Sequence, residues 1–406
     1  MMSIAATGIT ENSSQTLEVE IERLLPGGVG LAHAEGRTIF VTLAAPGDIV
    51  RVRIERTRGK VAFASVVEIV KPSPVRMEPP CPYFGRCGGC DFQQLSYESQ
   101  LQTKLDIIRD CLHRIARIES PPEIQTYPSP DQWQYRARAN WQFDADSKHL
   151  GYFERGSHRV CDVEFCAVLV PELQQVLETL RNEVRAGALG GASGEIDAVA
   201  GDDSVSVNPD FGILNGGVVS RKIAEETYRF DARTFFQINH ILAGSLIQNA
   251  IGDLRGAVAV DLYCGVGLFT LPLARRFERV IGVESNRGAA EFARRNLEVA
   301  QLSNANIVTS RVADWIKHSH RPEKLDLLLL DPPRTGAEPQ VIEKIAEWHP
   351  ARISYVSCDP ATLARDLKTL LAAGYSLDSV AAFDMFPQTH HVETVVWLTS
   401  FEDDVK

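Results

Sequence analysis

The stretch AVAVDLYCGVGLFTLPLARRFERVIGVE, at residues 257–284, runs from an apolar segment through a glycine turn and an amphipathic segment into a second apolar segment. This order is typical of a strand, a helix and a parallel strand that follow one another in an α/β sheet. Further apolar segments follow at NIVTSRVADW (306–315), LDLLLLDPPR (325–334) and ISYVSCDP (353–360). This part of the chain therefore predicts a Rossmann-like domain, a parallel sheet with helices on both faces.

The first part of the chain predicts further domains. Residues 16–70 alternate apolar and polar side chains in short runs separated by Gly and Pro, which indicates a small antiparallel β-barrel. A proline-rich linker, KPSPVRMEPP, occupies residues 71–80, and a helix is expected from about residue 97 to residue 118. Residues 130–234 have the pattern of an irregular β-rich region, with a flexible Gly-rich stretch at 186–194. The chain is thus predicted to be a multidomain α/β protein.

The composition is that of a globular protein. The 406 residues include 42 Lys and Arg against 53 Asp and Glu, a formal net charge of −11, and 44% of the residues are hydrophobic. This length suits about two to four domains with separate cores, and the apolar content excludes a disordered chain. No apolar run approaches the roughly 18–20 residues of a membrane span, and the N-terminus lacks the pattern of a signal peptide. We therefore expect a soluble cytoplasmic protein.

One strand of the predicted barrel carries a local excess of positive charge in an otherwise acidic chain. Its basic side chains surround a single glutamate and are Arg51, Arg53, Arg56, Arg58 and Lys60. Alternation with Val50, Val52 and Ile54 puts the first two arginines on the outer face of the strand. Local basic density attracts phosphate, because salt screens charges that lie more than about 8 Å away. Two interpretations stay open, a surface for nucleic acid and an ordinary solvated strand face.

A glycine turn follows the first predicted strand of the α/β domain, at Asp261-Leu-Tyr-Cys-Gly-Val-Gly267. Gly265 and Gly267 allow a tight turn and a close approach of a ligand to the backbone at the carboxyl end of this strand. Thr270 stands where a pyrophosphate-binding loop has its third glycine, so a nucleoside ligand without a pyrophosphate fits better. S-adenosylmethionine is the obvious candidate.

Two acidic residues follow the next two predicted strands. Glu284 ends the apolar run VIGVE and is placed to accept hydrogen bonds from ribose hydroxyls. Asp314 follows the third strand, where its carboxylate could face the adenine amine. The alternative for this aspartate is a capping role at a helix that begins at Trp315.

Two more motifs are predicted to face the same crevice, because each follows an apolar strand. Asp331-Pro-Pro-Arg334 would form a rigid loop whose acid holds a ligand or the edge of a substrate base. The alternative is a stiff exit from the strand, which accounts for the prolines but not for the two charged residues. Cys358, in Ser-Cys-Asp-Pro, is a candidate nucleophile, and its alternative is a small buried hydrophobic residue.

The segment FPQTHHVE, at residues 386–393, leads into the apolar run TVVWL. Burial of Glu393 at the start of this run would raise the pKa of its carboxyl group and suit it to proton abstraction, whereas the alternative is an ordinary acid at a strand edge. His390 and His391 could contact phosphate or a metal ion, but two such residues without spaced partners more often line a loop.

Three cysteines are clustered in the Gly-rich segment Cys81-x5-Cys87-x2-Cys90. In a chain without an export signal, this spacing indicates a metal ion or an iron–sulfur cluster, for which four thiolates are normally required. The spacing is not the C-x3-C-x2-C associated with radical chemistry on S-adenosylmethionine. The candidates for the fourth ligand are Cys111, Cys161 and Cys166.

Together these motifs resemble the RNA (uracil-5-)-methyltransferase family, and specifically its iron–sulfur, RlmD-like branch. The motifs span nearly the whole chain and include the cysteine segment, FFQIN at 235–239, DLYCGVG, DPPR, SCDP and MFPQTHHVET. The resemblance implies three domains. The first is a TRAM-like β-barrel RNA-binding domain at 12–72, and the second is a central iron–sulfur domain at 75–92 and 126–234. The third is an S-adenosylmethionine-dependent methyltransferase domain at 93–125 and 235–406.

The resemblance also implies a role for each motif residue. Cys358 matches the nucleophile of the family and Glu393 its base. A [4Fe–4S] cluster is implied at four cysteines, the last of them in a CAVL stretch that matches CPVL of the family: Cys81, Cys87, Cys90 and Cys166. Leu268 stands where the family often has Asn. The positions that match S-adenosylmethionine contacts of the family are Gln237, Tyr263, Glu284 and Asp331. Gly265, Gly267 and Asp314, which the strand pattern indicates, complete the predicted cofactor site.

The implied reaction is methyl transfer to C5 of a specific uridine in RNA, with 23S rRNA as the expected substrate and tRNA as the alternative. Addition of a thiolate at C6 makes C5 nucleophilic, and a carboxylate then removes the C5 proton. A 5-methylcytosine RNA methyltransferase uses the same thiolate chemistry but does not account for Glu393 or the clustered cysteines. The other alternative is a non-catalytic RNA-binding protein whose cluster senses iron or oxidants. We expect no membrane partner and no obligate protein partner.

Overall fold

The computed structural model describes residues 16–188, 193–212 and 217–401. Contacts divide the chain into two compact units, Met1–Ile107 with Pro387–His390, and Ile108–Phe386 with His391–Lys406. The predicted start of the barrel at residue 12 and residues 189–192 of the predicted Gly-rich stretch lie outside the described residues. Each unit is described by itself below.

In its described residues the first unit contains a six-stranded sheet in the order β1-β5-β6-β4-β3-β2. Its strands are β1 (Thr16–Glu20), β2 (Arg23–Leu25), β3 (Val29–Ala34), β4 (Arg37–Thr42), β5 (Ile49–Arg58) and β6 (Val61–Lys71). Neighbouring strands are antiparallel except β4 and β6, so the prediction of a purely antiparallel barrel is wrong at this pair. Because β5 reverses the chain between them, β4 and β6 run in the same direction. β1 also contacts β3, which curls the sheet towards a barrel.

Strand β5 has the two faces that the sequence predicts. Val50, Val52 and Ile54 are fully buried in the core of the barrel, while Arg51 and Arg53 alternate with them on the outer face. Helix α1 (Tyr97–Arg114) follows the linker and ends earlier than the predicted residue 118.

The second unit is built on an eight-stranded sheet in the order β17-β16-β15-β18-β19-β21-β20-β7, counted over the described residues. Its strands are β7 (Ile124–Tyr127), β15 (Gly256–Leu262), β16 (Phe277–Glu284), β17 (Ala305–Thr309), β18 (Leu327–Leu330), β19 (Arg352–Ser357), β20 (Tyr375–Phe383) and β21 (Glu393–Ser400). From β17 to β19 all neighbours are parallel, as predicted. β21 instead runs antiparallel to β19 and β20, because the chain turns back after β20 without a crossover helix.

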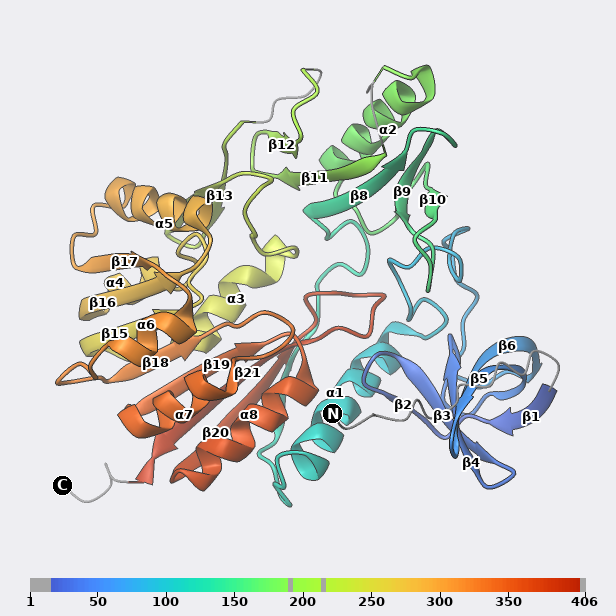
Figure 1. Ribbon diagram of the computed structural model, residues 1–406, viewed down its shortest axis with the longest axis horizontal. Coiled ribbons are helices and arrows are strands. Elements are labelled where there is room, and N and C mark those ends of the chain that lie inside the picture. Colours follow the sequence, from blue (N-terminus) through green and yellow to red (C-terminus); the bar gives the residue numbers. More distant parts are fainter. Residues whose placement is uncertain (1–15, 189–192, 213–216, 402–406) are drawn as a thin grey trace, which may run out of the picture. The chain divides into compact units, whose positions relative to one another are not determined.

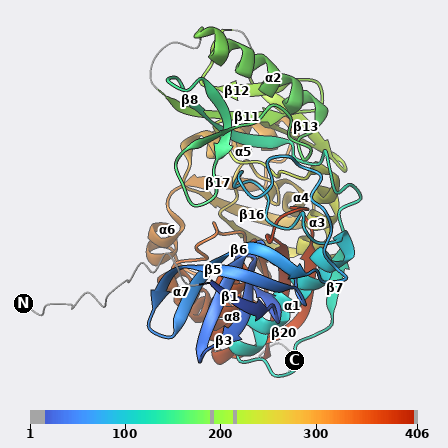
Figure 2. The same ribbon diagram turned by 90° about the vertical axis from the view of Figure 1, so that its right-hand side faces the viewer.

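Helices cover both faces of this sheet, with α6 and α7 on one face and α3 and α4 on the other (Figures 1 and 2). Helix α7 also packs against α6 and α8, and α4 packs against α5. The helix bounds are α3 (His240–Ile251), α4 (Thr270–Ala274), α5 (Arg287–Val299), α6 (Val312–His318), α7 (Pro339–Trp348) and α8 (Pro360–Ala372). This arrangement is the Rossmann-like fold predicted from residue 257 onward.

The predicted β-rich region of the second unit forms an antiparallel sheet, in the order β10-β9-β8-β11-β12, and a hairpin of β13 and β14. The bounds are β8 (Arg138–Asp144), β9 (His149–Phe153), β10 (Val160–Asp162), β11 (Gly194–Ala200), β12 (Val205–Asn208), β13 (Val219–Ile223) and β14 (Glu226–Phe230). Helix α2 (Pro171–Ala186) packs on β8, β9 and β11 and was not predicted (Figure 2). Its apolar residues Leu173, Val176, Leu177, Leu180 and Val184 follow helical spacing and are buried.

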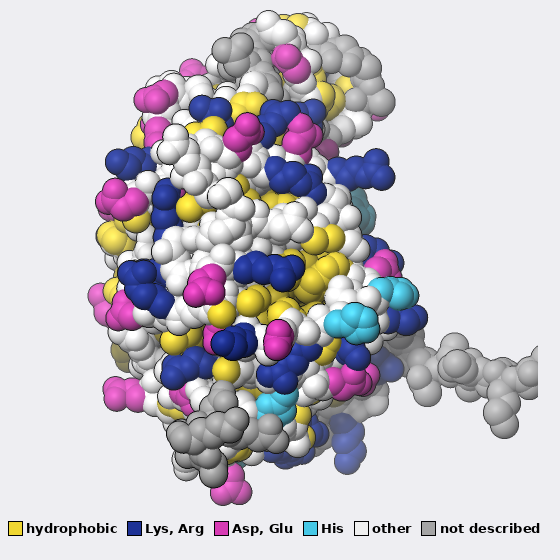
Figure 3. Space-filling model, turned by 90° about the vertical axis from the view of Figure 1, so that its left-hand side faces the viewer, with side chains coloured by type: hydrophobic (Ala, Val, Ile, Leu, Met, Phe, Trp, Pro, Cys, Tyr) yellow, Lys and Arg dark blue, Asp and Glu magenta, His cyan; other side chains and the backbone are white. Residues whose placement is uncertain are grey.

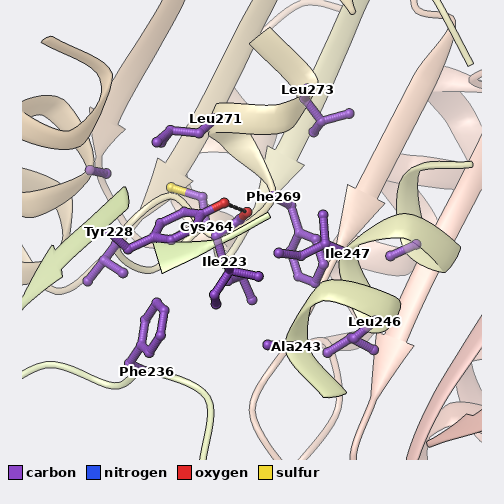
Figure 4. Packing of buried hydrophobic residues seen from close by; sticks show 14 of the residues in the cluster. Ile223, Tyr228, Phe236, Ala243, Leu246, Ile247, Cys264, Phe269, Leu271 and Leu273 are labelled. Atoms are coloured by element: carbon purple, nitrogen blue, oxygen red, sulfur yellow. Dashed lines mark hydrogen bonds between the residues drawn. The ribbon is translucent and has the colours of Figure 1, made fainter. Parts of the chain in front are cut away.

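The main core of the second unit connects the β13–β14 hairpin, α3 and the glycine turn. Tyr228 and Phe236 pack with ring centroids 5.7 Å apart, in a cluster that also contains Cys264 and Phe269 (Figure 4). The hydroxyl of Tyr228 donates to the backbone carbonyl of Leu268 at 2.9 Å. The hairpin therefore supports the glycine turn directly. Over the part of the chain that the structure describes, every helix is too short or too polar to cross a membrane.

Candidate active site

The candidate site lies at the carboxyl edge of the eight-stranded sheet. Glu284 ends β16, and Asp331 and Cys358 directly follow β18 and β19. β21 is antiparallel to β19, and its register pairs Ser357 with Thr394. Cys358 follows Ser357, and Glu393 precedes Thr394. Strand pairing alone therefore brings the candidate nucleophile and the candidate base to the same edge of the sheet.

A cavity of about 640 Å³ opens at this edge and is lined by residues of the second unit. The predicted site residues that line it are Gln237, Tyr263, Gly265, Glu284, Asp331, Arg334, Cys358 and Glu393. Its volume lies in the range of small-molecule and cofactor sites, about 300–1,000 Å³. The structure thus brings together most of the residues that the sequence singled out.

Two predicted residues do not line this cavity, Gly267 and Asp314. Asp314 is exposed in the first turn of α6, and the helix begins at Val312 with Arg311 as its cap. The alternative that this aspartate caps a helix starting at Trp315 is therefore wrong. Arg311 and Val312 line the cavity at this strand end.

The glycine turn has the backbone geometry that its sequence predicts. Gly265 and Gly267 have φ angles of 55° and 93°, in the region that favours glycine. A Cβ atom on Gly267 would lie 2.9 Å from Cδ1 of Leu271, so this glycine serves packing of the turn against α4. Glu284 accepts hydrogen bonds from the backbone N–H of Gly265 at 3.0 Å and of Asn286 at 2.6 Å. Each carboxylate oxygen keeps acceptor capacity that could serve a ribose hydroxyl.

Tyr263 is fixed by a partner that the sequence did not reveal. Its φ is 63°, and its hydroxyl donates to Oε2 of Glu338 at 2.8 Å. Nη2 of Arg311 lies 4.0 Å from Oε1 of the same glutamate, and all three residues line the cavity. Glu338 lies 75 residues from the tyrosine and directly before α7. No spacing rule joins residues this far apart, so sequence reasoning could not find this pair.

Aromatic residues at the cavity were also missed as site residues. Phe235 and Phe386 line it, although only Gln237 of the FFQIN motif was assigned a role. Phe235 is 59% exposed, which is high for a phenylalanine. An exposed ring at the mouth of a site is available to stack on a nucleic-acid base.

The pKa values of the two candidate reactive groups are both shifted towards the neutral form. Burial, followed by the charges of Glu393 and Asp331, raises the pKa of the Cys358 thiol to about 12. Glu393 is 4% exposed, and burial followed by the charge of Asp331 raises the pKa of its carboxyl group well above the ordinary range. This is the direction predicted from its apolar neighbours. The charge of Arg334 opposes both shifts.

Two further acids, one lining the cavity and one in the adjacent strand β15, also have raised pKa values. Burial raises the pKa of Asp331 to about 7. Asp261 is fully buried, and burial raises the pKa of its carboxyl group to about 7 against the effect of a hydrogen bond from Thr270. A cationic ligand such as a sulfonium would favour the ionised forms of nearby acids, because opposite charges attract strongly where water is excluded.

The three clustered cysteines are half-buried in a loop of the first unit: Cys81, Cys87 and Cys90. The N–H of Gly89 donates to Sγ of Cys87 at 3.4 Å. Cys166 is half-buried in the second unit, whereas the other candidates for a fourth ligand, Cys111 and Cys161, are buried. Within the described residues, no three His, Cys, Asp or Glu side chains form a group that could hold a metal ion.

Positive charge is dispersed over the face of the molecule that Figure 3 shows, and part of it is paired on strand β5. In Figure 3, lysine and arginine side chains alternate with acidic ones and do not form one continuous basic patch. On the outer face of β5, Arg51 forms ion pairs with Glu18 and Glu68, and the guanidinium of Arg56 lies 4.2 Å from the centroid of the Phe63 ring. Part of the predicted basic face is thus already engaged within the barrel.

Two family models match the chain. A model of tRNA (uracil-5-)-methyltransferase matches residues 217–401, and a model of the TRAM domain of tRNA (uracil(54)-C(5))-methyltransferase matches residues 17–75. A Pectobacterium atrosepticum protein, the 23S rRNA (uracil(1939)-C(5))-methyltransferase RlmD, is 33% identical, with 94% of this chain and 93% of that protein covered. The chain belongs to the RNA (uracil-5-)-methyltransferase family.

Two more proteins are similar to this uracil-5-methyltransferase over nearly its whole length. A Thermotoga maritima protein named as an uncharacterized RNA methyltransferase is 32% identical over 94% of this chain and 98% of its own. The crystal structure of Pyrococcus abyssi tRNA (uracil-54, C5)-methyltransferase with S-adenosyl-L-homocysteine matches with a TM-score of 0.74 at 26% identity, covering 94% of this chain and 99% of that one. The protein is an S-adenosylmethionine-dependent RNA uracil-5-methyltransferase with a TRAM domain, as its motifs predicted.

Proposed function

We propose that this methyltransferase modifies C5 of a specific uridine through Cys358 as the nucleophile and Glu393 as the base. The observation that carries this proposal is the pairing of β19 with β21, which brings a thiol and a buried carboxyl group to one cavity. Uracil C5 is a weak nucleophile, so the reaction needs both groups in one place. A lone cysteine after a strand would not need a carboxyl group beside it.

The steps follow from the chemistry of the ring. The thiolate of Cys358 forms a bond to C6, and the electron pair of the C5–C6 double bond moves to the C4 carbonyl as an enolate. S-adenosylmethionine supplies an electrophilic methyl group. The C5 carbon of the enolate bonds to that methyl group, and the sulfonium becomes a neutral thioether. Glu393 then takes the C5 proton, the C5–C6 double bond forms again, and the thiolate leaves.

Burial has opposite consequences for the two groups. A carboxylate in an apolar site is a stronger base, which suits Glu393 to removing a proton from carbon. The thiol must instead lose its proton before it can attack. Arg334, whose charge lowers the pKa of Cys358, is the residue of this site that favours the thiolate. Arrival of a cationic methyl donor would act in the same direction.

For S-adenosylmethionine we assign the cavity residues at the strand ends: Gln237, Tyr263, Gly265, Glu284 and Asp331. Gly267 does not line the cavity, but its lack of a side chain lets the glycine turn pack closely against Leu271 of α4. Asp314 stays a weaker candidate for the adenine amine, since it does not line the cavity. Leu268 does line it, so the position where the family often has Asn contributes an apolar contact here.

We propose 23S rRNA as the substrate, with tRNA as the second candidate. The similarity to the Pectobacterium RlmD protein favours rRNA, and the similarity to the Pyrococcus enzyme favours tRNA. Identity is higher to the RlmD protein, at 33%, than to the Pyrococcus enzyme, at 26%. This difference and the clustered cysteines support rRNA. Phe235 at the cavity mouth and the barrel strand β5 are the surfaces that we assign to RNA.

We also propose a [4Fe–4S] cluster and three domains with the bounds predicted from the sequence. Residue type and position in the sequence support this proposal, because thiolates are the ligands of such clusters and Cys81, Cys87 and Cys90 lie half-buried in one loop, where an N–H···S bond is present. Cys166 is the half-buried candidate for the fourth ligand. Iron and sulfide analysis after anaerobic purification, with Cys87→Ser as the variant, tests this assignment. Full iron content in that variant would refute it.

The experiment that tests the reaction uses methyl-labelled S-adenosylmethionine with unmodified 23S rRNA and unmodified tRNA in separate assays. We expect labelled 5-methyluridine from rRNA. Cys358→Ala and Glu393→Gln should abolish turnover and retain S-adenosylhomocysteine binding, while Cys111→Ala, a buried cysteine outside the cavity, should stay active. Turnover of Cys358→Ala near the wild-type rate would remove the nucleophile. Label in tRNA alone would change the substrate but keep the chemistry.

A further inference from the structure

The segment Pro387–His390 belongs to the first unit, although it lies almost at the end of the chain. It is the middle of the connection between β20, which ends at Phe383, and β21, which begins at Glu393. The candidate base is therefore three residues from a segment that packs with the N-terminal part of the chain. Gln388, at its centre, is 2% exposed and has a φ of 68°.

The backbone of this segment is bound by the residues that directly follow the clustered cysteines. The N–H groups of Asp91 and Phe92 both donate to the carbonyl oxygen of Gln388, at 3.1 and 3.0 Å. Asp91 is the residue next to Cys90 in the chain. One carbonyl that accepts two backbone hydrogen bonds is held in both position and direction.

A side chain of helix α1 adds to this attachment. Gln100 of α1, 1% exposed, donates from Nε2 to Oε1 of Gln388 at 3.0 Å, and its own Oε1 accepts the backbone N–H of Gln388 at 2.9 Å. Buried amides paired in this reciprocal way are costly to separate, because each would lose its partner out of reach of water.

The end of the segment nearest to β21 is held by Asp91. Its Oδ1 accepts the backbone N–H of His390 at 2.8 Å, and its Oδ2 lies 2.5 Å from Nδ1 of the same histidine. The barrel contributes Gly28, where a Cβ atom would lie 3.1 Å from both Cβ of His390 and Cε1 of Phe92. A side chain at this glycine would press on the histidine, so the barrel turn is shaped around the segment.

We propose that Asp91 and Gln100 are positioning residues that fix the 387–390 segment and, through it, the carboxylate of Glu393. This inference rests on the proposed role of Glu393 as the base. Most of a loop's freedom lies in its middle, and here that middle is held by several hydrogen bonds from residues far away in sequence. Proton transfer depends steeply on geometry, so freeing the segment should slow the last step of the reaction more than the earlier ones.

An RNA that contains 5-fluorouridine at the target separates these steps. Thiolate addition and methyl transfer can proceed on it, but C5 then carries fluorine and a methyl group and has no proton to lose. Because Glu393 has no C5 proton to remove, the C5–C6 double bond cannot form again and the thiolate cannot leave. The covalent adduct between Cys358 and the RNA therefore persists. Adduct formation therefore reports on Cys358, the methyl donor and RNA binding, whereas turnover on ordinary RNA also requires Glu393.

The variants are Asp91→Ala and Gln100→Leu, with Asp91→Asn as the conservative change that keeps an acceptor for the N–H of His390. Glu22→Ala is the matched control, since it removes an acid–histidine contact with His33 on the exposed surface of the same unit. S-adenosylhomocysteine affinity, measured on each variant, shows that the second unit is folded.

We expect turnover at saturating RNA to fall by about 10²-fold in Asp91→Ala and Gln100→Leu, with less loss in Asp91→Asn and none in Glu22→Ala. The rate of adduct formation should stay close to that of the wild type. Equal losses in adduct formation and turnover would overturn the inference, because these residues would then act through RNA binding or the thiol. Unchanged turnover would overturn it as well. A wild type that forms no adduct and does not turn over would remove the proposed function and this inference with it.

Discussion

Asp261 offers a quantitative test of how the second unit is built. It lies in β15, is fully buried and accepts a hydrogen bond from Thr270, while its other oxygen has no partner among the described residues. Burial raises the pKa of its carboxyl group from 3.8 to about 7. The perturbation is Asp261→Asn, which has nearly the same shape and does not titrate.

The sign follows from proton binding in the two states. Between about pH 5 and pH 7 the unfolded chain has lost the proton of Asp261, whereas most of the folded protein keeps it. The folded state then binds more protons, so stability falls as the pH rises through this window and is level above it. From pH 5 to pH 8 the loss is about 3 kcal/mol, since each pKa unit corresponds to about 1.4 kcal/mol and the titration is nearly complete one unit above the folded-state pKa. The asparagine variant does not have this loss.

The assay is the thermal midpoint of wild type and Asp261→Asn at pH 5 and pH 8. At about 2 °C per kcal/mol for a chain of this size, the wild type should lose roughly 5 °C more than the variant over this range. Any constant cost of the amide, such as an unpaired N–H group, cancels in this difference. Parallel pH curves for the two proteins would refute the reasoning, because Asp261 would then ionise as it does in water.

Three further results are expected. Burial raises the pKa of Cys358 to about 12, so the rate of its alkylation by iodoacetamide should rise about tenfold per pH unit from pH 7 to pH 10. Peptide mass spectrometry measures this rate, and a plateau within the range would contradict the raised pKa. Tyr263→Phe loses the hydrogen bond to Glu338 and should raise KM for S-adenosylmethionine about fivefold at constant kcat. A change in kcat alone would contradict a role of this tyrosine in cofactor binding. Gly267→Ala should lower the thermal midpoint more than Gly265→Ala, because only a Cβ atom at position 267 would clash with a neighbouring side chain. Equal losses in the two variants would show that this clash does not destabilise the protein.

Local pattern was sufficient for the Rossmann-like half and for most residues of the candidate site that line the cavity. A buried parallel strand is a short apolar run, and its carboxyl end is the place where ligands bind, so Glu284, Asp331 and Cys358 could each be assigned from the strand before them. Alternation likewise predicted the two faces of β5. Helix α2 was missed although its apolar spacing is helical, because it lies within a region whose overall pattern is β-rich.

Contacts between distant parts of the chain decided the rest. The antiparallel insertion of β21, which brings Glu393 to the thiol, depends on strand pairing that local pattern does not encode. The bond between Tyr263 and Glu338 spans 75 residues, and that between Gln100 and Gln388 spans 288. Residue type and spacing determine which groups can react, because they act over a few neighbours. Where those groups meet depends on the order of strands in the sheet and on partners hundreds of residues away, which only the folded chain brings together.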